Sequence, residues 1–510
     1  MITLLILLVA LGVLGWGFYR ARPFGKLGIL AWLQSVVLMA PWLIFFGLFS
    51  LGIYLNLAVV LLLLVASIGL YVFLGSRLRA MGQDPTVQQQ IARTSQAQAS
   101  EGKPEPTTDA TPPTPAVADT AELTPPTNAP VAADQNATDM TKIPAEDLAA
   151  LQGIFGIDTF FVTETIPYQE GAIFKGNLRG DPESTYSRLS SHLRERLGDR
   201  YNLFLVAGPE DRPTVVVLPS SNAPKATTVP QFILAVVLAI ATLLTCAQAT
   251  GFLLGFDLLQ QPDRFVQTLP ITLGIVTVLA AHELGHRWLA HRHQVKLSPP
   301  FFLPTLQIGS FGALTRFESL LPNRSVLFDV AFAGPAAGGI VALGMVCLGL
   351  VLSHPGSLFQ IPSGFFQGSI LVGTLARVVL GDALQQPLVD VHPLLVVGWL
   401  GLVITAINLM PAGTLDGGRI VQAIYGRRTA GRTTVATIIL LGIVSFVNQL
   451  ALYWAIVILF LQRDLERPAF NELSEPDDAR AALGLLALFL MAATLLPLTP
   501  SLAGRLGIGG

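Results

Sequence analysis

The sequence predicts a mainly α-helical polytopic membrane protein, with about nine or ten transmembrane helices, a small cytoplasmic α+β domain and a disordered linker. Of the 510 residues, 52% are hydrophobic and only 13% are charged, whereas soluble domains carry about 25% charged residues. Apolar runs of about 20 residues, the length that crosses a bilayer, recur near both ends of the chain, and mean hydropathy is +0.60. A long stretch rich in Pro, Thr and Ala separates the two groups of runs.

The N-terminal part, 1–80, contains three apolar runs, at 1–19, 28–49 and 52–74. The first run has neither a basic leader nor a small-residue cleavage site, so we expect an uncleaved helix. It is also not rich in Arg and Ser like a plastid transit peptide, which favours a bacterial protein. Basic residues follow the first and third runs: Arg20, Arg22, Lys26, Arg77 and Arg79. The positive-inside rule therefore predicts an external N-terminus and places the segment after residue 80 in the cytoplasm.

Two different segments follow, a linker at 81–142 and a small domain at 143–222. The linker cannot bury enough apolar surface to fold, so we expect it to be disordered. In the domain, the peptide 176–180, Gly-Asn-Leu-Arg-Gly, has the composition of a tight turn. A role in docking or regulation is the alternative for that peptide. Hydrophobic spacing predicts helices at 145–155 and 183–197 and strands at 159–165, 201–207 and 214–218.

Membrane spans resume in the predicted core, 229–465, and in the C-terminal part, 466–510. The run 433–462 is long enough for one tilted helix or for a hairpin that turns at Asn448 and Gln449. The hairpin is favoured because it keeps the following Arg463 on the basic, cytoplasmic side. The remaining apolar runs lie at 230–254, 270–293, 326–353, 394–412 and 480–498.

The most informative residues form the sequence His282-Glu283-Leu284-Gly285-His286. Positions i and i+4 of a helix lie on one face, so both imidazoles can bind one Zn²⁺. Glu283 follows the first histidine and can serve as general base toward the water that zinc activates. Ionisable groups inside an apolar helix are costly and are functional by default. The alternative, a histidine pair that caps a helix end, is less favoured for that reason.

A catalytic zinc needs a third protein ligand. With two cysteines in the whole chain, both in apolar runs, a cysteine-ligated metal and a disulfide scaffold are excluded. The best candidate is Asp416, in the sequence Asn408-Leu-Met-Pro-Ala-Gly-Thr-Leu-Asp416-Gly-Gly. This segment ends an apolar helix on the same predicted side as the histidine pair. Four other histidines fit less well, because they lie at the helix end or on the opposite side: His291, His293, His354 and His392.

These two motifs together resemble the site-2 protease family of intramembrane zinc metalloproteases. The stretch from Ile154 to Gly180, which contains the Gly-Asn-Leu-Arg peptide, resembles the ethylene-dependent gravitropism-deficient and yellow-green branch of plastids and cyanobacteria. The resemblance implies that His282, His286 and Asp416 bind zinc and that Glu283 is the catalytic acid and base. Because the chain lacks the composition of a transit peptide, the resemblance also implies a cyanobacterial plasma or thylakoid membrane. The clusters of basic residues at the helix ends near both motifs place the expected active site near the cytoplasmic side.

The expected activity is ATP-independent cleavage of transmembrane segments of proteins embedded in the lipid bilayer, because no nucleotide-binding loop is present. Asn408 is a candidate catalytic residue that donates to the oxyanion, or else it holds the broken helix. The segment 299–319 is expected to be a β-hairpin that pairs with unwound substrate, or simply a covering loop. A formal net charge of −2 gives no basic excess to hold nucleic acid.

Two other functions compete with this interpretation. A prenyl-protein-type membrane protease also uses the two-histidine motif, but that class typically takes a downstream glutamate as its third ligand. A zinc-binding membrane scaffold or transporter would need no general base. The variant Glu283→Gln would separate these functions, because a protease would lose cleavage while it retained zinc.

Overall fold

The computed structural model describes residues 143–508, apart from 169 and 209–211, together with short pieces between 15 and 77. The predicted linker at 81–142 and most of the first three predicted spans therefore lie outside the described residues. Two units divide the chain, one comprising 1–132 with 441–454 and the other comprising 133–440 with 455–510. The described pieces of the first unit between 15 and 77 are helical, and Phe18 packs edge-on against Trp32 with ring centroids 4.9 Å apart.

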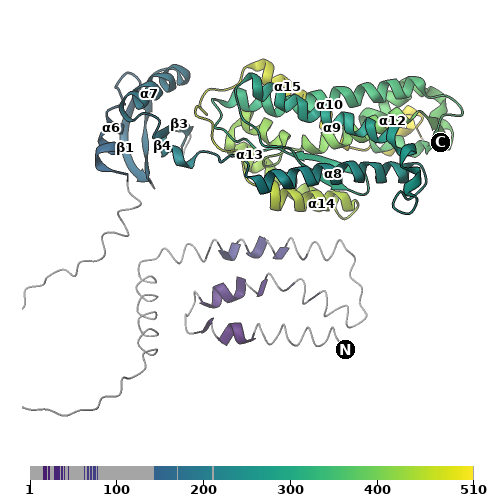
Figure 1. Ribbon diagram of the computed structural model, residues 1–510, viewed down its shortest axis with the longest axis horizontal. Coiled ribbons are helices and arrows are strands. Elements are labelled where there is room, and N and C mark those ends of the chain that lie inside the picture. Colours follow the sequence, from purple (N-terminus) through teal and green to yellow (C-terminus); the bar gives the residue numbers. More distant parts are fainter. Residues whose placement is uncertain are drawn as a thin grey trace, which may run out of the picture. The chain divides into compact units, whose positions relative to one another are not determined.

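The second unit begins with a middle domain of two helices and a four-stranded antiparallel sheet in the order β1-β2-β4-β3. The helices cover one face of this sheet, and their leucines fill its core together with Phe160 and Phe174 (Figure 1). A carboxylate from Asp181 caps α7 by accepting from the backbone N–H of Glu183 and Ser184. The elements are α6 (Ala145–Gln152), β1 (Phe160–Tyr168), β2 (Gly171–Leu178), α7 (Pro182–Leu197), β3 (Tyr201–Ala207) and β4 (Pro213–Pro219).

The interpretation of the Gly-Asn-Leu-Arg peptide as a turn is wrong, because its first three residues belong to β2. Gly176 pairs with Val162 beside a bulge in β1. A Cβ atom at Gly176 would lie 2.2 Å from the carbonyl oxygen of Phe161, so the close approach of the two strands requires glycine here. A glycine that serves a strand contact looks the same in sequence as a glycine that serves a turn.

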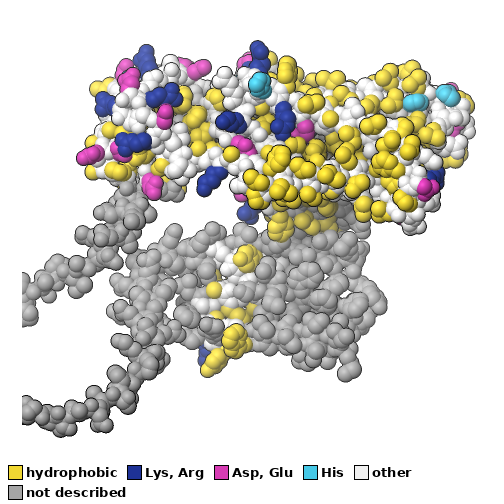
Figure 2. Space-filling view, in the orientation of Figure 1, with side chains coloured by type: hydrophobic (Ala, Val, Ile, Leu, Met, Phe, Trp, Pro, Cys, Tyr) yellow, Lys and Arg dark blue, Asp and Glu magenta, His cyan; other side chains and the backbone are white. Residues whose placement is uncertain are grey.

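The core is a bundle of helices that lie alongside one another (Figure 1). Four of these helices are long and apolar enough to cross a membrane: α8 (Val229–Leu253), α9 (Phe265–Arg292, with a short helical turn before it), α10 (Arg324–Leu352) and α15 (Asp478–Leu495). The shorter helices of this part of the chain are α11 (Ile370–Leu380), α12 (Pro393–Asn408), α13 (Asp416–Val444), α14 (Gln449–Val457) and α16 (Pro500–Leu506). Hydrophobic side chains cover the bundle in Figure 2, while charged side chains gather over the middle domain and the adjoining helix ends. This distribution is that of a multi-pass membrane protein.

The run 433–462 is interrupted as the hairpin prediction requires. One helix, α13, ends at Val444, and α14 begins at Gln449. Both arms of the run contact the same turn at 413–414. Thr434 Oγ1 accepts from the N–H of Gly413 at 2.8 Å, and the Gln462 carbonyl accepts from the N–H of Thr414 at 3.0 Å. One tilted helix could not bring both arms to the same turn.

Three further details concern the segments around α9 and α10. Pro270 lies inside α9. The cap of α10 is Asn323, whose side chain accepts from the N–H of Val326. The segment 299–319 does form a hairpin, with β5 (Phe301–Thr305) antiparallel to β6 (Gly309–Leu314).

An ion cluster joins α9, α10 and α15 at one end of the bundle. Asp329 accepts two hydrogen bonds from Arg480, at 2.7 and 2.9 Å, and lies 3.1 Å from His293 Nε2. A bidentate pair between two helices fixes both their distance and their rotation. Asp329 therefore has a structural role at this end of the bundle.

Candidate active site

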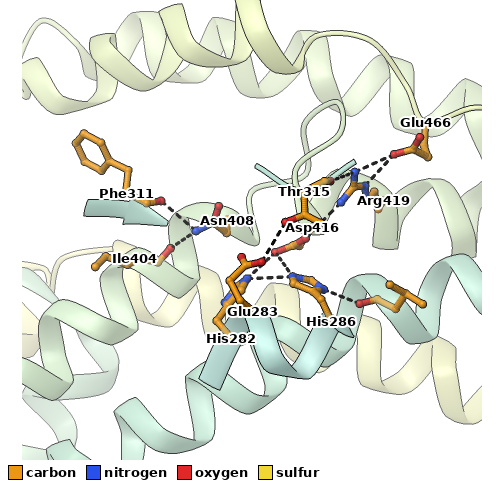
Figure 3. A network of polar contacts seen from close by, with 11 residues as sticks. His282, Glu283, His286, Phe311, Thr315, Ile404, Asn408, Asp416, Arg419 and Glu466 are labelled. Carbon is orange, nitrogen blue, oxygen red and sulfur yellow. Dashed lines mark hydrogen bonds and ion pairs between the residues drawn. The ribbon is translucent and has the colours of Figure 1, made fainter. Parts of the chain in front are cut away.

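Helix α9 presents both histidines of the His-Glu-Leu-Gly-His motif on one face, and Asp416 at the start of α13 faces them (Figure 3). The Nε2 atoms of His282 and His286 lie 3.1 Å apart. Asp416 Oδ2 lies 3.1 Å from the first Nε2 and 3.4 Å from the second. All three side chains are buried. Residues separated by 134 positions in the sequence therefore bring three donor atoms to one point.

The donor set fits a zinc ion. Ligands of a tetrahedral zinc at about 2.0–2.1 Å are separated by about 3.3 Å, which matches the observed distances. The other ring nitrogen of His286, Nδ1, donates to the carbonyl oxygen of Val330 at 2.7 Å. This bond fixes the tautomer that leaves Nε2 unprotonated and available to a metal.

Small residues in α10 let the histidine helix approach closely. A Cβ atom at Gly334 would lie 2.1 Å from His286 Nε2, and one at Gly338 would lie 3.0 Å from His282 Cβ. Real Cβ atoms essentially never approach other atoms closer than 3.0 Å. The two glycines of the Gly-Pro-Ala-Ala-Gly sequence in α10 are thus needed for close packing against the two histidines.

Glu283 lies beside the three donor atoms and is also buried. One oxygen of its carboxylate lies within 4.8 Å of a ring nitrogen of each histidine. Thr315, which follows β6, donates its hydroxyl to Glu283 Oε2 at 3.0 Å. This contact fixes one carboxylate oxygen and leaves the other available for proton transfer. Nothing in the sequence marks Thr315 as a site residue, because only the fold of the hairpin brings it to α9.

Asn408, at the end of α12, uses its side-chain amide to connect two elements. Nδ2 donates to the carbonyl oxygen of Phe311 in β6 at 3.2 Å and to that of Ile404 at 2.9 Å. Of the two roles considered for Asn408, this geometry is that of a residue that holds the helix end and the hairpin. A role in binding the oxyanion stays a prediction.

Arg419 is a second residue that the sequence analysis did not select as a site residue. It is buried one turn after Asp416, and its guanidinium lies 2.9 Å from Glu466 and 3.9 Å from Asp416 Oδ1. It also donates to the carbonyl oxygen of Thr315 at 2.7 Å. The only sequence signal for it was its spacing of three residues after the aspartate, which places the two side chains on one helix face.

A cavity of about 580 Å³ opens beside these residues. His286, Asp416 and Thr315 lie in its wall, as do the segment after β6 and the chain around 461–468. The volume is in the usual range for a binding cleft. The four other histidines do not join the three donor atoms: His293 pairs with Asp329, His392 caps α12, and His291 and His354 are not part of the cluster.

Comparison with known proteins gives consistent results. A family model described as peptidase family M50 matches residues 270–448, and a model described as the EGY3 middle domain matches residues 149–225. Probable zinc metalloprotease EGY2, chloroplastic, from Arabidopsis thaliana is 41% identical over 367 residues, which cover 70% of this chain and 66% of the relative. The EGY2 protein of Oryza sativa subsp. japonica is 38% identical, with coverage of 71% and 68%. The EGY1 protein of Arabidopsis thaliana is 36% identical, with coverage of 72% and 74%.

The chain thus spans about two thirds of the length of its relatives, and no solved structure matches it. The expected zinc chemistry and membrane location agree with the buried histidine–glutamate–histidine group and with the apolar helices. The chain belongs to peptidase family M50, the site-2 protease family, and is a membrane zinc metalloprotease with an EGY-type middle domain.

Proposed function

We propose that this metalloprotease is an intramembrane endopeptidase that cleaves transmembrane segments of other proteins without ATP. In this proposal His282, His286 and Asp416 hold the zinc, and Glu283 is the catalytic acid and base. The observation that carries the proposal is the convergence of three donor atoms at 3.1–3.4 Å, with a buried carboxylate beside them, inside a bundle of apolar helices.

Zinc bound between the three donor atoms would polarise the scissile carbonyl and lower the pKa of a coordinated water. Glu283 accepts a proton from the attacking water and passes it to the leaving amine. Thr315 keeps the Glu283 carboxylate in one orientation through its 3.0 Å hydrogen bond. Val330 does the same for the His286 ring. Preorganised groups of this kind need little rearrangement during the reaction.

The substrate must present an extended peptide, because a helical peptide bond is shielded by its own hydrogen bonds. The β5–β6 hairpin could bind such a peptide as an added strand, since in the described chain β6 has a strand partner on one edge only. Residues just beyond β6 line the same cavity as His286 and Asp416. An unwound substrate segment that adds to this edge as a strand would lie next to the catalytic group.

The test uses purified protein in detergent, a single-span test protein and the variant Glu283→Gln. We expect the variant to bind zinc normally. Its cleavage rate should fall by 10²- to 10⁴-fold or more, because an amide cannot carry the proton. Helix-breaking residues in the substrate span should accelerate cleavage by the wild type. Near-normal cleavage by Glu283→Gln would favour the zinc-binding scaffold or transporter instead. Of the enzyme alternatives, the prenyl-protein type is disfavoured by the position of Asp416 next to both histidines.

We also propose a cyanobacterial plasma or thylakoid membrane, with the active site near the cytoplasmic side. Support comes from the chloroplastic relatives and from the basic residues at the active-site ends of the helices: Arg287, Arg292 and Lys296 after the histidines, and Arg427 and Arg428 in α13. A cysteine introduced at Ser100 should resist impermeant thiol reagents in intact cells. Labelling of that cysteine without permeabilisation would reverse the orientation.

A further inference from the structure

The buried guanidinium of Arg419 contacts groups from three separate segments (Figure 3). It lies 3.9 Å from Asp416 Oδ1 in its own helix and donates to Glu466 Oε2 at 2.9–3.0 Å from Nη2 and Nε. Nη2 also donates to the Thr315 carbonyl at 2.7 Å, and the group lies over the ring of Phe317 at 4.9 Å. A planar guanidinium with several fixed donors is suited to hold such groups in register, which a lysine could not do.

These contacts support the carboxylates of Asp416 and Glu283, the first directly and the second through Thr315. Asp416 directs Oδ2 toward the histidines, and Oδ1 is the oxygen that faces Arg419. Thr315 gives its carbonyl to Arg419 and its hydroxyl to Glu283. One guanidinium therefore supports the third donor atom of the metal site and also the residue that orients the general base.

We propose that Arg419 is a positioning residue for zinc binding and cleavage, that Glu466 holds it, and that the middle domain holds Glu466 through the segment 466–472. The proposal rests on the ligand assignment made under Proposed function.

The connecting segment, 466–472, is bound at both of its ends. At the first end, the Gln422 side chain donates to the Glu466 carbonyl and accepts from its N–H, both at 3.1 Å. At the other end, the segment adds to the outer edge of β3: the N–H of Leu205 donates to the Phe470 carbonyl at 2.7 Å, and that of Glu472 donates to the Leu205 carbonyl at 2.9 Å. The Phe470 ring packs against Phe204 with centroids 5.4 Å apart.

The charges predict what happens when the network is cut. Without Glu466, Asp416 is the one carboxylate among the described residues that stays within 4 Å of the guanidinium, and we expect the guanidinium to move toward Asp416 and compete with zinc for that carboxylate. Without Arg419, Asp416 and Thr315 lose their support, and the partly buried Glu466 loses its cation. Both changes should lower zinc affinity. Mutation of partners that orient metal ligands typically costs 10–100-fold in affinity or activity.

The experiment measures zinc affinity by competition with a chelator, and kcat and KM with a single-span test protein, on the full chain. We expect Arg419→Gln and Glu466→Gln to lose about 10–100-fold in zinc affinity, with a lower kcat and an unchanged KM. Arg419→Lys should recover part of the loss, because the charge remains. The matched controls are Arg463→Gln and Glu475→Gln, whose exposed side chains touch neither carboxylate of the site.

Zinc affinities of Arg419→Gln and Glu466→Gln within twofold of their controls would overturn the proposal. If Arg419→Gln does not fold, Glu466→Gln and Arg419→Lys still decide the question. For the middle domain, Phe470→Ala should lower zinc affinity in the same direction relative to Phe161→Ala, a truncation on the far edge of the sheet. Equal affinities would remove the middle domain from the proposal. A wild type that binds zinc but cuts nothing would refute the proposed function alone, because the affinity series does not depend on cleavage.

Discussion

Replacing Gly334 with alanine adds one methyl group at the closest contact between α10 and the metal site. The new Cβ would lie 2.1 Å from His286 Nε2, whereas ordinary contacts begin at about 3.4 Å. The ring or the helix must therefore move by about 1 Å, and a displacement of 1 Å at a catalytic group costs about 10²-fold in rate. Because Nε2 is the atom that faces the other donors, zinc affinity should fall together with the rate.

The same helix offers a matched control. A Cβ at Gly344 would meet no atom within 4 Å, so Gly344→Ala should keep full activity and gain up to about 1 kcal/mol of helix stability. Gly338→Ala should fall between the two, because its Cβ would lie 3.0 Å from His282 Cβ. The assay compares zinc content, kcat/KM and the melting temperature of the purified proteins. Equal zinc content and activity in Gly334→Ala and Gly344→Ala would refute the close-packing argument.

Three other outcomes follow from single contacts. Thr315→Val should lower kcat about tenfold while KM and zinc content stay unchanged, because a hydrogen bond to a charged group is worth about 1.5–3 kcal/mol. Thr315→Ser should restore kcat, and a fully active valine variant would contradict this expectation. Asp329→Asn should lower the free energy of unfolding by about 1–3 kcal/mol, because Arg480 loses its bidentate partner, and unchanged thermal unfolding would refute it. Burial and the hydrogen bond to Asp147 raise the pKa of Tyr201 to about 12, above its unfolded value of about 10. The stabilisation from this tyrosine is therefore complete below pH ~10 and is lost as the pH rises through ~12. The unfolding midpoints of wild type and Tyr201→Phe should converge over that interval. A constant difference between the two midpoints would contradict the assignment.

Local patterns were sufficient for the elements whose side chains repeat with one period. The strand prediction at 201–207 coincides with β3, and the helix prediction at 183–197 differs from α7 by one residue. Strand β2 was missed because its Gly176 indicates a turn in isolation, and only the neighbouring strand shows why glycine is needed. The cap of α10 is open to the same ambiguity in the sequence, since both Asn323 and Ser325 are good capping residues and the backbone geometry selects Asn323.

The sequence indicates the candidate metal ligands but not the residues that contact them, because only the ligands are restricted in residue type. A metal limits its ligands to a few residue types, and an apolar helix tolerates ionisable groups only for a function, so His282, His286 and Asp416 stand out from their surroundings. Thr315 and Arg419 obey no such restriction, because a hydroxyl and a guanidinium occur in many loops and helix ends. Their importance arises when the fold brings Thr315 to Glu283 and Arg419 to Asp416. A sequence of this kind therefore indicates the candidate metal ligands, and the fold indicates the groups that contact them.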